Sequence, residues 1–308
     1  MAGDPIRPEG GISCKVSFCC VMAIHPPTVA TLGTRALLCL WLAFGGTLAM
    51  VGGCTPPSSV PGGGASSLQS GEQAVGTADT TPYAMVLEAR VDAQGLVDYE
   101  GLQRQPGTLE RFLRTLADVT PQRYRAWPER EQIAFLINAY NAITLGAIIE
   151  QQPLKASIRD ILGVWRIRTH PVMGQALTLD AIEHQILRKE FNEPRIHAAL
   201  VCAAMSCPPL RREPYEASRL DRQLDDQVRR WLGGPHGFRI DRAGERVLIS
   251  AIFRWFGEDW RRADPSAAKV PGHENDSAVL AFIGAYASPE DRAYLAQGGY
   301  ALGTLDYD

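Results

Sequence analysis

The chain has 308 residues, of which 45% are hydrophobic and 21% are charged, and its formal net charge is −3. This composition is ordinary for a globular protein, and the length allows one large domain or two small ones. A small net charge without long charged runs gives no reason to expect nucleic-acid binding, so no nucleic-acid partner is expected.

The N-terminal segment predicts a targeting signal. Residues 36–50 are uncharged and mostly apolar and follow the basic Arg35, as in a secretory signal, and they are too few for a membrane-spanning helix. The next four residues, Val51-Gly-Gly-Cys54, resemble a bacterial lipobox, where a signal peptidase cuts before a lipid-modified cysteine. We therefore expect a signal peptide over residues 1–53, with Met22 as an alternative start, and a lipid on Cys54.

A polar linker follows the expected lipidation site. Residues 54–80 are rich in Thr, Pro, Ser, Gly and Gln, so they predict a flexible tether to a single domain over residues 81–308. The lipid anchor would make the membrane a partner of the chain. Thr55 replaces the Asp that retains enteric lipoproteins at the inner membrane, so we expect the outer membrane, facing the periplasm. The alternative is a soluble secreted or periplasmic protein.

Processing of the signal would leave few cysteines in the domain. Four of the seven cysteines precede Cys54, which would carry the lipid, so only Cys202 and Cys207 remain. Two thiols this close in sequence, in an oxidising envelope, favour a disulfide.

The first half of the domain reads as helices. An apolar stripe predicts a helix over 109–119, and Pro128 opens a longer helix that runs to about Gln151. Its interior is apolar nearly all round, as in a helix at the centre of a domain. Asn138 and Asn141 lie on one face of this helix and need partners when buried. We favour hydrogen bonds to a neighbouring loop over the lining of a pocket.

A further helix carries an acidic and an imidazole side chain. Thr178 is expected to cap it, and the helix covers residues 179–191. Glu183 and His184 lie beside its apolar stripe, so one can point inward while the other faces water. Taken alone, the pair is read as a surface Glu and a packed His.

The segment that follows predicts a buried strand over residues 195–202. On a regular strand His197 and Cys202 point to opposite faces, so a direct pair between them is disfavoured without a bulge. Cys207 lies beyond the strand in a loop and has no such restriction.

The last elements mix helices and strands. Ser218 is expected to cap a helix, residues 238–249 read as a hairpin, and Ser250 opens an aromatic helix. A last helix is expected over 278–286. Because helices outnumber strands and the strands come late, the fold class is α+β. We expect a central buried helix with surrounding helices packed on a small, mainly antiparallel sheet.

Several short motifs together resemble the domain-of-unknown-function family 547. They are Phe135-Leu-Ile-Asn-Ala-Tyr-Asn141, Leu177-Thr-Leu-Asp-Ala-Ile-Glu-His184, Arg195-Ile-His197, Cys202, Ser206-Cys-Pro-Pro-Leu210 and Ile252-Phe-Arg-Trp-Phe-Gly-Glu-Asp259. The resemblance covers roughly residues 81–308 and implies an envelope or secreted α+β domain without an assigned activity. The family pattern usually continues past Tyr307-Asp308, so a truncated final strand is expected.

The favoured function is a ligand- or partner-binding module of the cell envelope. The ligand or partner protein is unknown, and no cofactor or metal is expected. A Cys202–Cys207 disulfide would join the end of the predicted strand to the Pro-Pro loop. The candidate binding residues are Asn138, Tyr140, Asn141 and Arg211.

The alternative is a thiol-dependent hydrolase or acyltransferase acting on peptide or amide bonds. Cys207 would be the nucleophile, His197 or His184 the base, and Glu183 or Asn138 would orient that base. The helix–strand order is loosely similar to the papain and transglutaminase folds, whose nucleophilic cysteine begins the central helix. A zinc site from both histidines and both domain cysteines is a third hypothesis, but the spacing matches no standard ligand pair.

Overall fold

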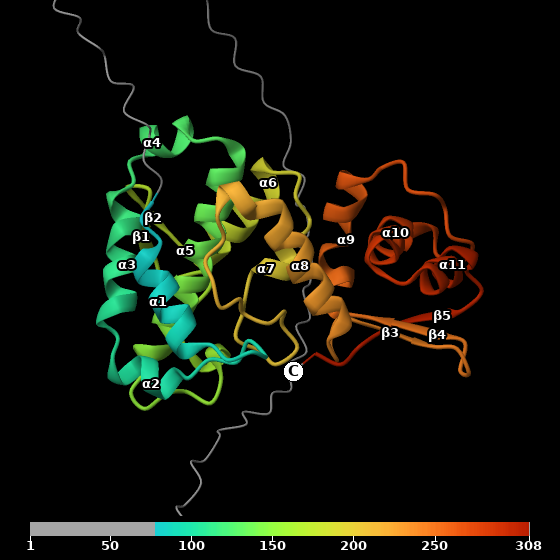
Figure 1. The fold of residues 1–308 in the computed structure, drawn as a ribbon, viewed down its shortest axis with the longest axis horizontal. Helices are drawn as coiled ribbons and strands as arrows, with labels where there is room; N and C mark the ends of the chain where they lie inside the picture. The colour runs from blue at the N-terminus through green and yellow to red at the C-terminus, as the bar shows by residue number, and fades with distance from the viewer. Residues whose placement is uncertain (1–77, 308) are drawn as a thin grey trace, which may run out of the picture. The chain divides into compact units, whose positions relative to one another are not determined.

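The computed structural model describes residues 78–307, so the predicted signal peptide, the lipidation site at Cys54 and nearly all of the linker lie outside the described residues. Within them, the chain forms mainly helices, together with two small sheets, one of two strands and one of three (Figure 1). The fold is α+β with a buried central helix, as the sequence predicts. The similarity to papain and transglutaminase folds stays a prediction.

Five helices precede the first strand. They are α1 (Thr81–Arg90), α2 (Tyr99–Arg104), α3 (Gly107–Asp118), α4 (Pro121–Ala126) and α5 (Glu129–Ile149). The helix predicted over 109–119 is α3, and the long helix opened by Pro128 is α5, with this proline as its N-cap residue. Every residue from Ile133 to Ile149 is buried. By length and composition α5 could cross a membrane, but 94% of its apolar window is buried inside the protein, as in a core helix.

A short hairpin leads into an unusual helix. Strands β1 (His170–Val172) and β2 (Gln175–Leu177) pair antiparallel. A π-helical segment, Ala181–Leu187, follows and continues as α6 (Arg188–Glu190), so the predicted helix over 179–191 is present with a different hydrogen-bond pattern. The Thr178 hydroxyl accepts a hydrogen bond from the Ala181 amide at 3.0 Å, as expected of a cap.

The strand predicted over 195–202 is wrong. These residues form the short helix α7 (Ile196–Ala199), followed by an extended loop. A short apolar run cannot be assigned to strand or helix by periodicity alone, and its two alanines favour a helix. Among residues 78–307, the segment pairs with no strand. Instead, the Asn141 side chain binds the Ala199 carbonyl and the Val201 amide. The strand argument that separated His197 from Cys202 therefore does not apply.

The C-terminal part combines the larger sheet with four helices. The elements are α8 (Leu220–Gly233), β3 (Phe238–Asp241), β4 (Arg246–Ile249), α9 (Ala251–Ala263), α10 (Ser277–Tyr286), α11 (Pro289–Gln297) and β5 (Ala301–Thr304). The β3–β4 hairpin and α10 follow the prediction, whereas α11 and the parallel pairing of β5 with β4 were not expected.

The two predicted helix caps in this part have different outcomes. Ser250 caps α9, because its hydroxyl accepts from the Ile252 amide at 3.4 Å. The cap predicted at Ser218 is wrong. A 3-10 turn, Ala217–Arg219, precedes α8, and Arg219 is the N-cap residue without a side-chain cap bond.

The buried residues form two clusters that meet at α7. The first cluster gathers apolar residues of α1 to α5 and the π-helical segment. The second gathers residues of α8 to α11 and the three-stranded sheet. Ile196 and Ala199 belong to the first cluster, whereas Ala198 belongs to the second. α7 therefore contributes residues to both clusters, as does α8, whose Leu220 and Leu224 belong to the first.

Candidate functional site

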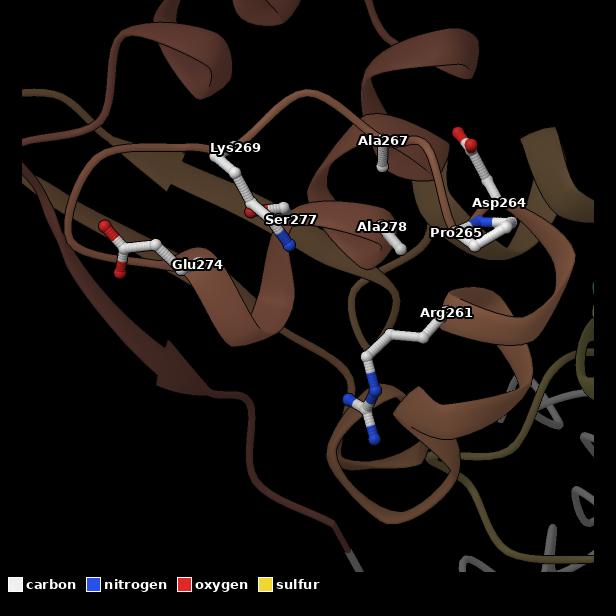
Figure 2. Close-up of a pocket in the computed structure, with 8 residues that line it drawn as sticks. All are labelled: Arg261, Asp264, Pro265, Ala267, Lys269, Glu274, Ser277 and Ala278. Carbon is white, nitrogen blue, oxygen red and sulfur yellow. The ribbon is translucent and has the colours of Figure 1, made fainter.

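A small pocket lies between the end of α9 and the start of α10 (Figure 2). It is lined by Arg261, Asp264, Pro265, Ala267, Lys269, Glu274, Ser277 and Ala278. The lining includes two cationic and two acidic side chains, and none of the residues singled out in the sequence belongs to it. The candidate site is therefore built elsewhere, around α5 and the π-helical segment.

The two asparagines of α5 hold two loops by their backbones. The Asn138 side-chain amide donates to the Tyr215 carbonyl at 2.8 Å, and its oxygen accepts from the Tyr215 amide at 2.9 Å. Asn141 bonds in the same way to the Ala199 carbonyl and the Val201 amide, both at 2.9 Å. Each asparagine side chain thus donates a hydrogen bond to the backbone of one loop and accepts one from it, as a paired strand would. These hydrogen bonds satisfy the buried side-chain amides, and those of Asn141 hold in place the loop that leads to Cys202.

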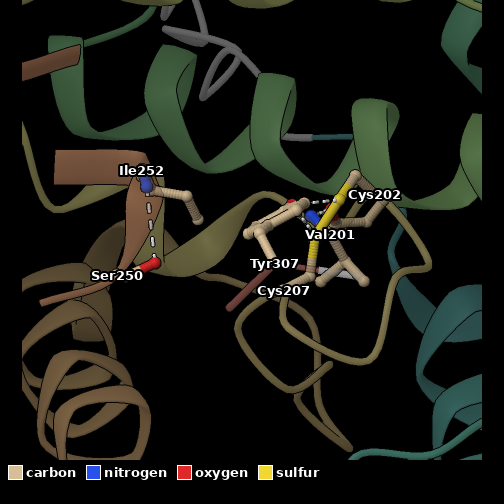
Figure 3. Close-up of a disulfide and its surroundings, with 7 residues drawn as sticks. Val201, Cys202, Cys207, Ser250, Ile252 and Tyr307 are labelled. Atoms are coloured by element: carbon tan, nitrogen blue, oxygen red, sulfur yellow. Dashed lines mark hydrogen bonds between the residues drawn. A yellow bond between two sulfur atoms is a disulfide. The ribbon is translucent and has the colours of Figure 1, made fainter. Parts of the chain in front are cut away.

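Cys202 and Cys207 form a disulfide (Figure 3). Both cysteines are half-buried, and the loop between them includes Ala203 in the left-handed region at φ 61° and the exposed Met205. The hydroxyl oxygen of Tyr307 lies 3.1 Å from each sulfur. Tyr307 follows β5, so the last strand brings this hydroxyl to the disulfide.

His197 is buried in a network that joins α7 to α9. Its Nε2 donates to Asp259 Oδ2 at 2.8 Å, and Arg188 Nε donates to the same oxygen at 2.6 Å. The imidazole stacks on Phe256 at 4.6 Å and on Trp260 at 5.1 Å between ring centres. Burial by itself would raise the pKa of Asp259, but the hydrogen bonds from His197 and Arg188 lower it to about 2. Asp259 is therefore a carboxylate at neutral pH.

The π-helical segment presents the acidic and imidazole pair beside this network. His184 Nδ1 lies 3.8 Å from Glu183 Oε1 and accepts from Arg188 Nη1 at 3.3 Å. The His184 ring is 5.8 Å from Phe256, where α9 departs from helical geometry at φ −119° and ψ 18°. Single-turn π segments occur frequently at functional sites.

Tyr140 connects this segment to the disulfide. It is buried on α5, and burial raises its pKa well above the usual range. The adjacent Glu183 carboxylate, hydrogen-bonded to the Tyr140 hydroxyl, raises the pKa further, and Tyr307 adds to it, whereas a hydrogen bond with Trp165 lowers it. Tyr140 thus lies between the π-helical segment and the C-terminal tail.

Aromatic contacts link Tyr307 back to His184, so that the interacting residues form a closed circuit. Tyr307 packs edge-on against Trp255 at 4.7 Å, and Trp255 lies 6.5 Å from Phe256, which returns to His184. We call the six residues of this circuit the junction cluster. They are Tyr140, Glu183, His184, Trp255, Phe256 and Tyr307. All except Tyr140 are partly exposed.

The comparisons with known proteins bear on the segment that carries much of this site. A family model described as "Protein of unknown function, DUF547" matches residues 124–232. This match supports the domain family inferred from the motifs. The DUF547 match includes α5, the π-helical segment and both cysteines, whereas α9 and Tyr307 lie beyond it. Neither curated proteins nor solved structures give a match to the chain.

The structure places the sequence-predicted residues in several separate groups. Tyr140, Glu183 and His184 lie in the junction cluster, whereas His197 belongs to the adjacent buried network. The two cysteines are bonded to each other beside the cluster. Asn138 and Asn141 hold loops.

Arg211 lies apart from the cluster and pairs with Glu213 at 2.7 Å and Asp226 at 2.5 Å. Within residues 78–307, no group of three or more His, Cys, Asp or Glu residues is placed to hold a metal ion, so the zinc hypothesis finds no support there.

Sequence reasoning missed five contributors, namely Arg188, Trp255, Phe256, Asp259 and Tyr307. Trp255, Phe256 and Asp259 stand in one of the motifs that carry the family resemblance, but nothing in the pattern assigned them to a site. Arg188 follows His184 by four residues, a spacing that could have placed both side chains on one helical face.

Proposed function

We propose that the chain is a cell-envelope lipoprotein whose domain binds a ligand or partner at the junction cluster. The lipid on Cys54 would anchor it to the outer membrane, with the domain in the periplasm. The lipobox-like segment and the polar linker support the anchor. The observation that carries the binding role is the closed circuit of partly exposed aromatic and ionisable side chains around a π-helical segment.

The chemistry of the cluster favours a ligand that carries an ammonium group. Glu183 offers a carboxylate held by the Tyr140 hydroxyl, and aromatic faces attract cations. Arg188, a largely buried cation beside the cluster, is paired with Asp259 at 2.6 Å and Glu258 at 2.7 Å. It also lies 4.5 Å over the Phe256 ring, so Trp255 is the aromatic ring that we expect to meet the ligand's ammonium group. Asp180, the partly exposed N-cap residue of the π-helical segment, lies 3.9 Å from His184 Nε2 and adds negative charge, which Arg166 offsets in part at 3.3 Å. A positively charged group is thus complementary to this surface.

Calorimetric titration of the full chain with 1,5-diaminopentane tests this proposal. Such a fragment is expected to bind with a Kd of about 1 mM, equivalent to about −4 kcal/mol. Its uncharged counterpart, 1,5-pentanediol, should not bind measurably. Glu183→Gln should abolish binding, whereas Glu190→Gln, an equal charge change at an exposed position of α6, should leave it intact. Equal binding of the diol, or unchanged binding by Glu183→Gln, would refute the proposal.

The thiol-dependent hydrolase or acyltransferase is not favoured. The sulfur that would attack a substrate, Cys207 Sγ, is bonded to Cys202. The buried candidate base, His197, has its Nε2 bonded to Asp259. Nucleophilic catalysis requires a thiolate, and the disulfide form has none.

A further inference from the structure

We propose that the Cys202–Cys207 disulfide is a reactive centre that exchanges with a dithiol partner. Access to the sulfurs is the first support. Both cysteines are half-buried, and the loop between them carries the small residues Ala203 and Ala204, both half-exposed. Met205, 50% exposed, offers an apolar and adaptable contact next to the bond. A disulfide that serves only as a staple needs none of this exposure.

The Tyr307 hydroxyl is the second support. It lies 3.1 Å from both sulfurs, so it can donate a hydrogen bond to whichever sulfur leaves as a thiolate. A hydrogen bond to the charged form lowers the pKa of the leaving thiol, and a thiol of lower pKa leaves faster. Tyr307 is therefore a positioned donor for either direction of attack.

The backbone of the loop is the third support. Ala203 has φ 61°, a region that residues other than glycine rarely adopt. The ring closed by the disulfide helps to hold this conformation. Opening the ring lets Ala203 return to a relaxed conformation, so reduction is favoured by the release of local strain.

The exchange proceeds through a mixed disulfide with the partner. A thiolate of the partner attacks one sulfur, for example Cys207 Sγ, and forms a mixed disulfide. The bond to Cys202 Sγ breaks, and this sulfur leaves with the electron pair as a thiolate next to the Tyr307 hydroxyl. The second thiol of the partner, once deprotonated, attacks the mixed disulfide and releases Cys207 as a thiolate. The partner gains a disulfide, and the domain gains two electrons and, on protonation, two thiols.

Reduction of the folded full chain by dithiothreitol tests the chemistry independently of amine binding at Glu183. The reaction is quenched with iodoacetamide and the alkylated fraction measured by mass spectrometry. We expect the wild-type disulfide to be reduced about tenfold faster than oxidised glutathione, because a leaving thiolate that accepts the Tyr307 hydrogen bond departs more readily. A rate no faster than that of oxidised glutathione would overturn the proposal.

Two variants separate the contributions. Tyr307→Phe should slow reduction about tenfold, while Tyr294→Phe, a half-exposed tyrosine of α11, should react like the wild type. Ala203→Gly should shift the equilibrium with dithiothreitol toward the disulfide by about fivefold. Circular dichroism checks that each variant is folded. If Tyr307→Phe is unfolded, Ala203→Gly and the wild-type rate decide the outcome. Unchanged behaviour of folded Tyr307→Phe contradicts the role of the hydroxyl.

Discussion

Replacing Asn141 with Ala removes two buried hydrogen bonds and keeps the helix intact. The Ala199 carbonyl and the Val201 amide, each 2.9 Å from the side chain, would lose their partner. An unsatisfied buried group costs about 1–3 kcal/mol, so the free energy of unfolding should fall by about 4 kcal/mol. The loss should fall mainly on the segment that joins α7 to Cys202, because Asn141 is its tie to α5.

Urea denaturation of the full chain, followed by circular dichroism and tryptophan fluorescence, measures this loss. Thr144→Val is the matched control, because its buried hydroxyl bonds to the Tyr140 carbonyl within α5 itself. We expect the control to lose about 1 kcal/mol or less. A loss for Asn141→Ala no greater than that of Thr144→Val would refute the idea that this amide holds the loop.

Two further predictions concern acid stability and anchoring. The hydrogen bonds from His197 and Arg188 outweigh the effect of burial and lower the pKa of Asp259 to about 2. The ionised carboxylate therefore contributes its full stabilisation above about pH 4, and this contribution is lost as the pH falls toward 2. The wild type should therefore lose about 2 kcal/mol more than Asp259→Asn over this range, measured by urea denaturation, and parallel curves would contradict it. Cys54→Ser should move the protein from the membrane fraction to the soluble fraction, whereas Cys39→Ser should not, and a membrane-bound Cys54→Ser variant would exclude the lipid anchor.

The parts of the fold with strong local signals could be predicted from the sequence. The apolar run of α5 and the need of Asn138 and Asn141 for partners follow from composition and hydrogen-bond capacity. The turn between β3 and β4 and the cap at Ser250 are equally local. The segment at Arg195 was misassigned because a short apolar run has no decisive period, and its partner, Asn141, lies far away in the sequence.

The site itself depends on contacts that no local pattern contains. Tyr307 reaches the disulfide only because β5 pairs with β4, and a parallel pairing of this kind leaves no hairpin signal in the sequence. The residues around Glu183 and His184 also have the spacing of an ordinary α-helix, so the sequence does not reveal their π-helical hydrogen bonds. Glu183 could be singled out, but its neighbour Tyr140 could not be paired with it.

The position of α7 has a consequence for cooperativity. Ile196 and Ala199 pack in one hydrophobic cluster, Ala198 packs in the other, and His197 bonds to α9. Unfolding of either cluster removes contacts from the same four-residue helix, so a loss of structure in one cluster destabilises the other. The domain should consequently melt as one unit, although its hydrophobic interior is divided in two.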